Sequence, residues 1–340
     1  MLFRFFRKKQ MILYLFNPSH DEALAANSPL YTPSKIAQRL ERELERFPAM
    51  WAESDARVGL SDMLPADWDA VSEVRPWGWD AVLCRRLRRL GAPARLLPSD
   101  ERLAALRALS SRATSSRLLP ELVGAVEGTF GQSALCADLA AVRSRLSEWG
   151  TLVVKAPWSC SGRGVFRVGE EDWAMAEKRI LSVLKKQGTV EVQPYYADAF
   201  NLAAEFFKRG ERVDYRGLSC FLTNAAGAYR GQLVAPQSQL EDYVFGADSS
   251  RARVRVIYNN VCRALCEKLP NALRGYDGPV GVDMLLCGDR LMPCLELNLR
   301  TTMGFVAPLI CERFEIASPR LLTFEEKDGA LKAVLCPIIL

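Results

Sequence analysis

The chain has 340 residues, 49% of them hydrophobic, so it is long enough to bury a large core and to form two or three domains. Its formal net charge of +5 comes from 45 basic and 40 acidic residues. This excess is too small to indicate nucleic-acid binding, although it suits an anionic ligand. No apolar run reaches membrane-spanning length, and LFRFFRKKQMILYLF is too charged for a signal peptide. We expect a cytoplasmic protein with no nucleic-acid or membrane partner, in which residues 1–10 are a tail or an upstream start before Met11.

The ten cysteines lie mostly in apolar runs, which is typical of reduced core residues. His20 is the only histidine and no CxxC pair occurs, so the sequence argues against a zinc site.

The first third of the chain alternates strand and helix patterns. Residues 11–17 (MILYLFN) predict a strand, and Ser19 and Glu22 have the spacing of a capping box at the start of a helix. A charged helix is expected at about 33–46. Residues 81–99 predict a helix, a glycine stop and a strand. We therefore expect a small α/β domain over residues 11–105.

The middle of the chain predicts helices first and then strands. Residues 101–127 and 133–148 have helical patterns, and TLVVKAP (151–157) predicts a strand. The later elements are expected as a helix at 171–187, a strand at 189–196, a hairpin about Arg209-Gly210, a helix at 250–268 and a hairpin at 281–300.

The last hairpin, GVDMLLCGDRLMPCLELNLR, carries charges in an apolar setting. A two-residue turn at Gly288-Asp289 would put Asp283 opposite Cys294. Because side chains alternate along strands, a polar face and an apolar face follow. The polar face holds Asp283, Cys294, Glu296, Asn298 and Arg300, and the apolar face holds Val282, Met284, Leu286, Leu295, Leu297 and Leu299. Such a polar face is either a solvated strand surface or a cluster of hard oxygen ligands.

Two further segments have ligand-binding chemistry. In VVKAPWSCSGRGVFRV, Lys155 ends a strand and a loop rich in Gly and Ser follows, which suits a phosphate although the P-loop pattern is missing. In TVEVQPYYADAF, backbone groups near Pro194 could meet an adenine edge and Asp198 a ribose. Taken singly, each segment could also be an ordinary turn.

The order of these three motifs resembles the ATP-grasp family of ATP-dependent ligases, over about residues 105–315. The resemblance implies an α/β (α+β) fold in which the N-terminal domain precedes two α+β subdomains that grip ATP. The expected boundaries are 106–193 for the subdomain with Lys155, 194–320 for the one with the hairpin, and 321–340 for a C-terminal segment.

The resemblance also implies roles for residues. Lys155 would contact the phosphates, Arg300 would steady the transferred phosphoryl group, and the loop from Ser159 to Gly164 would close over the nucleotide as a lid. The residues expected to bind the nucleotide are Arg112 (or else Arg117), Lys155, Ser159, Ser161, Gly162, Gly164, Glu191, Gln193, Tyr195, Tyr196 and Asp198. Near Gln193, the adenine-binding positions could instead lie two residues along the chain. Asp283, Glu296 and Asn298 would hold Mg²⁺, as two ions, with Mn²⁺ as an alternative.

The implied activity is formation of an acyl phosphate from ATP and a carboxylate, which an amine or similar nucleophile then attacks. The expected partners are ATP, a small-molecule or peptide carboxylate and an amine. The sequence is also compatible with an oligomer. The alternatives are a small-molecule kinase on the same fold and a non-catalytic nucleotide-binding regulator.

Substrate candidates lie in the first domain, where FNPSHDEAL leaves the end of a strand. They are Asn17, His20, Asp21, Arg75 and Trp77. The competing interpretation is that Ser19, Asp21 and Glu22 only start a helix and that the tryptophan belongs to the core.

Overall fold

The structure, a computed structural model, describes residues 11–61, 63–159, 164–223, 229–246 and 251–338. It divides into two compact units, Met1–Leu103 with Glu325–Ala333, and Ala104–Phe324 with Val334–Leu340. None of the helices in the described ranges has both the length and the apolar character needed to cross a membrane.

The first unit is built on a parallel sheet with strand order β2-β1-β3. Its strands are β1 (Met11–Leu15), β2 (Arg57–Val58) and β3 (Val71–Pro76), and its helices are α1 (His20–Ala26), α2 (Lys35–Glu43) and α3 (Ala81–Arg89). Single 3₁₀ turns lie at Phe47–Met50, Pro65–Asp69 and Ala94–Leu96. Leu13, Val74 and Leu87 are buried in its core, where apolar strand residues meet the apolar side of α3.

Two local expectations for this unit are wrong. The Ser19 side chain makes no capping hydrogen bond, and the Glu22 carboxylate accepts hydrogen bonds from the backbone N–H and the hydroxyl of Ser34, at 2.9 and 2.8 Å. The strand expected after the glycine stop is the 3₁₀ turn Ala94–Leu96. Its apolar residue Leu96 is buried in the core without joining a ladder.

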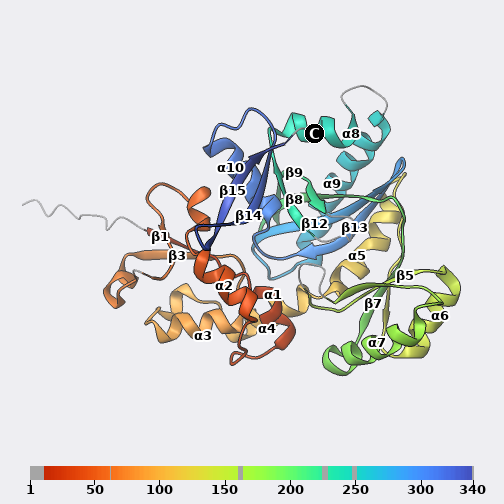
Figure 1. The fold of residues 1–340 in the computed structure, drawn as a ribbon, viewed down its shortest axis with the longest axis horizontal. Helices are drawn as coiled ribbons and strands as arrows, with labels where there is room; N and C mark the ends of the chain where they lie inside the picture. The colour runs from red at the N-terminus through yellow and green to blue at the C-terminus, as the bar shows by residue number, and fades with distance from the viewer. Residues whose placement is uncertain (1–10, 62, 160–163, 224–228, 247–250, 339–340) are drawn as a thin grey trace, which may run out of the picture. The chain divides into compact units, whose positions relative to one another are not determined.

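The second unit begins with a four-stranded antiparallel sheet of order β4-β7-β5-β6. After α4 (Asp100–Leu109) come α5 (Arg112–Ala125), β4 (Ala134–Cys136), α6 (Leu139–Trp149), β5 (Leu152–Lys155), β6 (Val165–Val168), α7 (Trp173–Gln187) and β7 (Val190–Pro194). Helices α6 and α7 pack against this sheet (Figure 1). The predicted helix 101–127 is therefore two helices, since Ser111 caps α5, and the helix expected from 133 begins as strand β4.

The rest of the chain contains two more four-stranded sheets, of order β13-β12-β8-β9 and β10-β11-β14-β15. The strands are β8 (Phe200–Arg209), β9 (Arg212–Ser219), β10 (Phe221–Thr223), β11 (Tyr229–Val234), β12 (Gly278–Cys287), β13 (Arg290–Asn298), β14 (Arg320–Lys327) and β15 (Ala330–Pro337). Helices α8 (Gln237–Phe245), α9 (Ala252–Ala272) and α10 (Met303–Arg313) complete the chain. α9 contacts β9 and β13, and α10 contacts β9, β11 and β12.

The β12–β13 hairpin forms with the predicted turn but with a different register. Cys287 pairs with Arg290 as expected, whereas Asp283 lies opposite Glu296 and not opposite Cys294. The ladder is irregular between Asp283 and Leu285, beside Pro293, which has no N–H to donate. Because the shift amounts to two residues, the alternation is kept, and Val282, Met284 and Leu297 are buried in the core as predicted.

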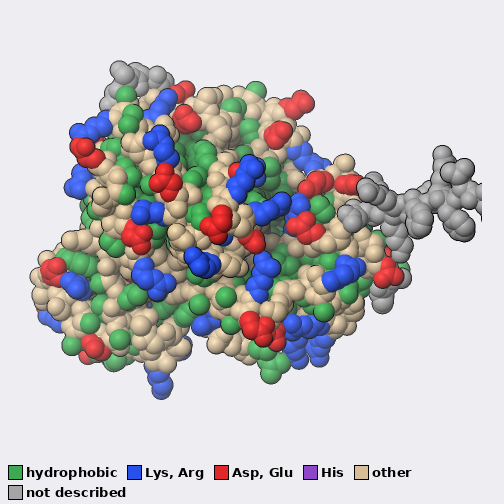
Figure 2. All heavy atoms as spheres, turned by 180° about the vertical axis from the view of Figure 1, so that it is seen from behind, with side chains coloured by type: hydrophobic (Ala, Val, Ile, Leu, Met, Phe, Trp, Pro, Cys, Tyr) green, Lys and Arg blue, Asp and Glu red, His purple; other side chains and the backbone are tan. Residues whose placement is uncertain are grey.

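Charge is mixed on the surface. On the face drawn in Figure 2, basic and acidic side chains are interspersed among hydrophobic and polar ones. Among the described residues, nine cysteines are free thiols, five of them buried.

Adjacent residues of α7 offer a direct test of the core of the β4-β7-β5-β6 sheet. Ile180 is fully buried in it, whereas Leu181 is 47% exposed. Ile180→Ala should lower the free energy of unfolding by about 2–5 kcal/mol, because it removes apolar contacts and leaves a cavity. Leu181→Ala should change it by no more than about 0.5 kcal/mol. Urea denaturation followed by circular dichroism measures both, and equal losses would contradict the packing described.

Candidate functional site

Residues distant in sequence converge within the second unit around the Arg112 guanidinium. Arg112 opens α5 and is 4% exposed. Its Nη2 donates to both carboxylate oxygens of Glu296, at 2.7 and 2.8 Å, and its Nη1 donates to the Ser159 hydroxyl at 2.7 Å and to the Ala156 carbonyl. Its Nε lies 4.0 Å from Glu191 Oε2. One side chain thus joins α5, the segment after β5, β7 and β13.

Lys155 approaches the same cluster from β5. Lys155 pairs in register with Glu191 and its Nζ lies 3.8 Å from Glu191 Oε2. The same ammonium donates to Gln193 Oε1 at 2.8 Å. Burial pulls the pKa of Lys155 down and the pKa of Glu191 up, and the attraction between the two groups opposes both shifts. The negative charges of Glu296 and Asp283 also favour a higher pKa for Lys155, so the hairpin carboxylates lie within electrostatic range of this lysine.

The polar face of the hairpin gathers two carboxylates and an amide. Asp283 and Glu296 are directly opposed, and Asn298 Nδ2 donates to Asp283 Oδ2 at 3.2 Å. Burial, followed by repulsion from Glu296, raises the pKa of Asp283 to about 7, while Arg300 opposes the shift. Arg300 Nη1 donates to the Thr301 carbonyl at 3.2 Å. Burial also raises the pKa of the Cys294 thiol on this face.

The remaining nucleotide candidates have other surroundings. Gly164 has φ +76° and its carbonyl accepts the Ala156 N–H at 2.8 Å, closing the base of the loop. Ser161 and Gly162, with most of the expected lid, lie outside the described residues. Beyond β7, Arg167 stacks over the Tyr195 ring, the Tyr196 ring packs edge-on against Phe130, and Asp198 has φ +55°. Tyr195 N–H donates to the Thr151 carbonyl at 2.8 Å, so this backbone group is already used.

Of the two arginines proposed in the α5 region, Arg112 contacts this cluster. Arg117 Nη2 lies 3.5 Å from the Thr114 hydroxyl of its own helix.

In the first unit, two of the substrate candidates form a buried network with a third residue. Asn17 Nδ2 donates to the Gly78 carbonyl at 2.7 Å and to Asp80 Oδ2 at 3.0 Å. His20 is 1% exposed, with its Nδ1 3.7 Å from Asp80 Oδ2. A Cβ at residue 78 would lie 2.5 Å from the His20 ring, so the close contact between this ring and the backbone at residue 78 requires glycine. The network ties the segments after β1 and β3 together.

The other substrate candidates have other surroundings. Arg75 donates to Glu73, Glu53 and Tyr14, Asp21 lies in the first turn of α1, and Trp77 is a core residue that packs edge-on against Phe16.

Sequence reasoning missed Glu205, which lies opposite Gly281 of β12 and therefore shares the polar face with Asp283. Glu205 on β8 is 2% exposed and accepts hydrogen bonds from Ser219 at 3.0 Å and Thr302 at 2.9 Å. Burial, followed by repulsion from Asp283, raises its pKa to about 8. A lone carboxylate in the apolar strand NLAAEFF was the signal that could have found it. Ser133, which donates to Glu191 Oε1 at 2.8 Å, has no comparable signal.

Neither a family model nor a curated protein sequence matches the chain. Solved structures do resemble it. A biotin carboxylase β-γ-ATP complex from Campylobacter jejuni has 15% identity and a TM-score of 0.51, covering 96% of this chain and 74% of that one. Phosphoribosylamine–glycine ligase from Thermotoga maritima has 14% identity and a TM-score of 0.51, covering 96% and 91%. Carboxyaminoimidazole ribonucleotide synthase from Aspergillus clavatus, complexed with ATP, has 16% identity and a TM-score of 0.50, covering 93% and 82%. The α/β fold that the order of the three motifs predicts is thereby confirmed.

Thr302 provides a test of how Glu205 is held on this face. Its hydroxyl donates to Glu205 Oε2 and accepts the Phe305 N–H at 2.9 Å, capping α10. Thr302→Val keeps the shape but removes both bonds, so it should lower the free energy of unfolding by about 1–3 kcal/mol. Thr302→Ser keeps the hydroxyl and should lose clearly less. Chemical denaturation of the three proteins measures the difference, and a valine variant as stable as the parent would contradict the network.

Proposed function

We propose that this chain, which has the ATP-grasp fold, is an ATP-dependent ligase that activates a substrate carboxylate as an acyl phosphate for attack by an amine. Two of the similar structures are named as complexes with ATP or β-γ-ATP, and one is named as a ligase joining an amine to glycine. These names support a nucleotide substrate and ligase chemistry for this chain.

The observation that carries the proposal is the convergence of Lys155, Arg112 and the hairpin carboxylates. The contacts run in an unbroken series from Lys155 to Glu191, from Glu191 to Arg112 and from Arg112 to Glu296. A random polar strand face would have no reason to meet a buried lysine and a buried arginine from other elements, because burying charges costs free energy unless they are paired. Phosphates, which carry several negative charges, would find two cations here.

The residues of the hairpin fit a magnesium ion. Among the described residues, no three His, Cys, Asp or Glu side chains are grouped to hold a metal, but the proposed set includes an amide. Two opposed carboxylates, with the Asn298 amide bonded to one of them, supply the hard oxygen donors that Mg²⁺ prefers when phosphate oxygens and water complete its shell. We assign Asp283, Glu296 and Asn298 to this role. Bound there, the ion would neutralise charge on the phosphates.

The protein side chains would act by binding and orientation. Lys155 would neutralise phosphate oxygens, and Arg300 would steady the transferred phosphoryl group beside the substrate carboxylate. Glu191 and Gln193 would hold the Lys155 ammonium in place through their present contacts. Holding the two reactants in line accounts for much of the rate in such a reaction, which requires little acid–base chemistry from the protein.

Hydroxylamine provides a direct test of the reaction class. Carboxylate metabolites would be incubated with the protein, Mg-ATP and hydroxylamine, which attacks acyl phosphates to give hydroxamates that form coloured complexes with added ferric iron. We expect one carboxylate class to give ADP and hydroxamate in equal amounts. ADP release with a hydroxyl compound and no hydroxamate from any carboxylate would instead indicate a kinase.

Glu296→Gln tests the assigned metal ligand. The variant nearly keeps the shape but removes a charge, so ATP turnover should fall at least about a hundredfold. Because Arg112 loses part of its partner, the free energy of unfolding should fall by about 1–3 kcal/mol without loss of the fold. Glu121→Gln, at an exposed ion pair with Lys268, is the matched control and should be neutral within about 0.5 kcal/mol. Full turnover by Glu296→Gln would refute the assignment.

Lys155→Met tests the phosphate contact while keeping most of the buried stem. Affinity for a non-hydrolysable ATP analogue, measured by calorimetry with Mg²⁺, should fall at least about tenfold, because a charge-assisted contact is worth about 1.5–3 kcal/mol. Lys186→Ala, at an exposed position at the end of α7, should bind like the parent. Unchanged affinity in Lys155→Met would remove this lysine from the nucleotide site.

A further inference from the structure

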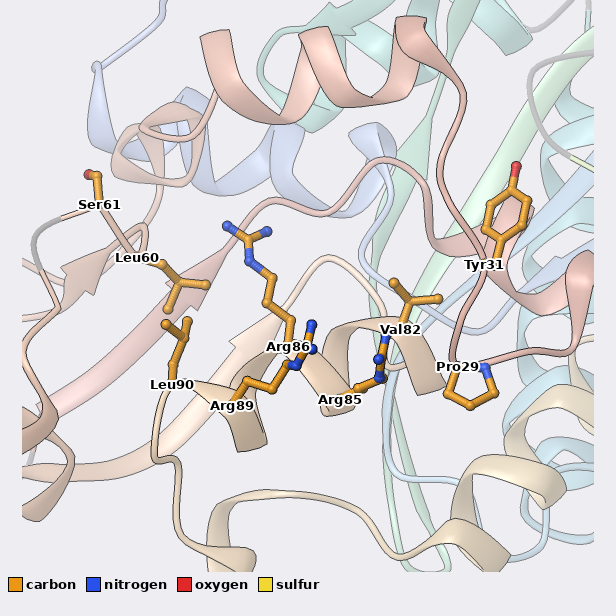
Figure 3. Close-up of a pocket in the computed structure, with 9 residues that line it drawn as sticks. All are labelled: Pro29, Tyr31, Leu60, Ser61, Val82, Arg85, Arg86, Arg89 and Leu90. Atoms are coloured by element: carbon orange, nitrogen blue, oxygen red, sulfur yellow. The ribbon is translucent and has the colours of Figure 1, made fainter.

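A cavity lies wholly within the first unit, along helix α3. It has a volume of about 410 Å³, within the range of small-molecule sites. Its lining comes from three segments: Pro29 and Tyr31 after α1, Leu60 and Ser61 after β2, and Val82, Arg85, Arg86, Arg89 and Leu90 of α3 and its end. Figure 3 shows the three arginines between Leu60 and Leu90 on one side and Pro29 and Tyr31 on the other.

The lining is strongly basic. It contains three arginines and neither Asp nor Glu. Arg86 pairs with Glu41, outside the lining. For Arg85 and Arg89, no carboxylate partner is found among the residues that the structure describes. Because they are one helical turn apart, these two cations repel each other, and an anion between them would relieve the repulsion.

Arg88 of the same helix does not line the cavity, and its Nη2 lies 3.0 Å from Asp100 Oδ1. Arg86 lines the cavity but is paired with Glu41. Arg85 and Arg89 are therefore the two lining arginines for which the described residues supply no carboxylate partner.

From this geometry we infer that the α3 cavity binds a small organic phosphate. Guanidinium groups match phosphate oxygens with paired N–H donors, and two of them about 5–6 Å apart at their Cβ atoms suit a dianionic group. The side chains of Leu60, Val82 and Leu90 supply apolar surface for the organic part. The inference goes beyond the proposed ligase reaction and does not depend on Lys155 or on the hairpin.

Phenyl phosphate is a suitable probe, because it combines a dianion with an apolar ring. It would be titrated calorimetrically into the full-length protein, saturated with a non-hydrolysable ATP analogue and Mg²⁺ so that the proposed nucleotide site is already filled. We expect saturable binding of one molecule per chain. Arg85→Gln/Arg89→Gln should weaken it at least about tenfold, since each lost charge-assisted contact is worth about a factor of ten or more.

Arg88→Gln is the matched control, since it removes the same charge from the same helix and should bind within about twofold of the parent. Thermal melting verifies that both variants are folded, and Arg85→Lys/Arg89→Lys should recover part of the affinity. The inference is overturned if the parent shows no saturable binding, if the double variant binds like the parent, or if Arg88→Gln loses as much. Benzoate binding as tightly as phenyl phosphate would overturn the assignment of a phosphate ligand.

Discussion

One buried cation organises the second unit. The Arg112 guanidinium donates to Glu296, to Ser159 and to the Ala156 carbonyl, and it lies beside Glu191. These partners come from three strands or their ends, so the position of each depends on the same planar group. A guanidinium fits this task because its N–H donors are fixed in a fork and it stays charged when buried. A lysine there would have the charge without the geometry.

The carboxylates of the polar face and of its neighbour β7 are held at different electrostatic costs. Glu296 and Glu191 have cationic neighbours, whereas buried Glu205 accepts hydrogen bonds from two hydroxyls, and its pKa is raised to about 8. Hydroxyl donors offset part of the cost of burying a carboxyl group, but they do not remove the repulsion from neighbouring negative charges. Repulsion from Asp283 is one of the causes of that shift. Glu205 and Asp283, which share one face of the sheet, are therefore electrostatically coupled.

Much of the fold and part of the candidate site followed from local patterns. Strand alternation predicted which side chains of the hairpin share a face, and the glycine- and serine-rich segment after Lys155 was recognised from composition. The contact between Arg112 and Glu296 could not be predicted, because it joins residues 184 positions apart and depends on how α5 meets β13. The strand β4 was missed for a related reason, because its three residues pair with β7 and this tertiary pairing outweighed a helical pattern. The break before α5, where Ser111 caps the helix, was also missed.

The irregular ladder in the hairpin limits how its length can change in evolution. From Leu285 to Asp283 the first strand advances two residues, while from Met292 to Glu296 its partner advances four. Because the two strands differ here by an even number of residues, each side chain stays on the same face of the hairpin. Insertions or deletions of single residues between Met292 and Glu296 would turn the carboxylate into the core and a leucine out of it, whereas changes in pairs would not. Homologous hairpins should accordingly differ in length at this point by even numbers, and the irregularity can be understood as a tolerated pair of extra residues.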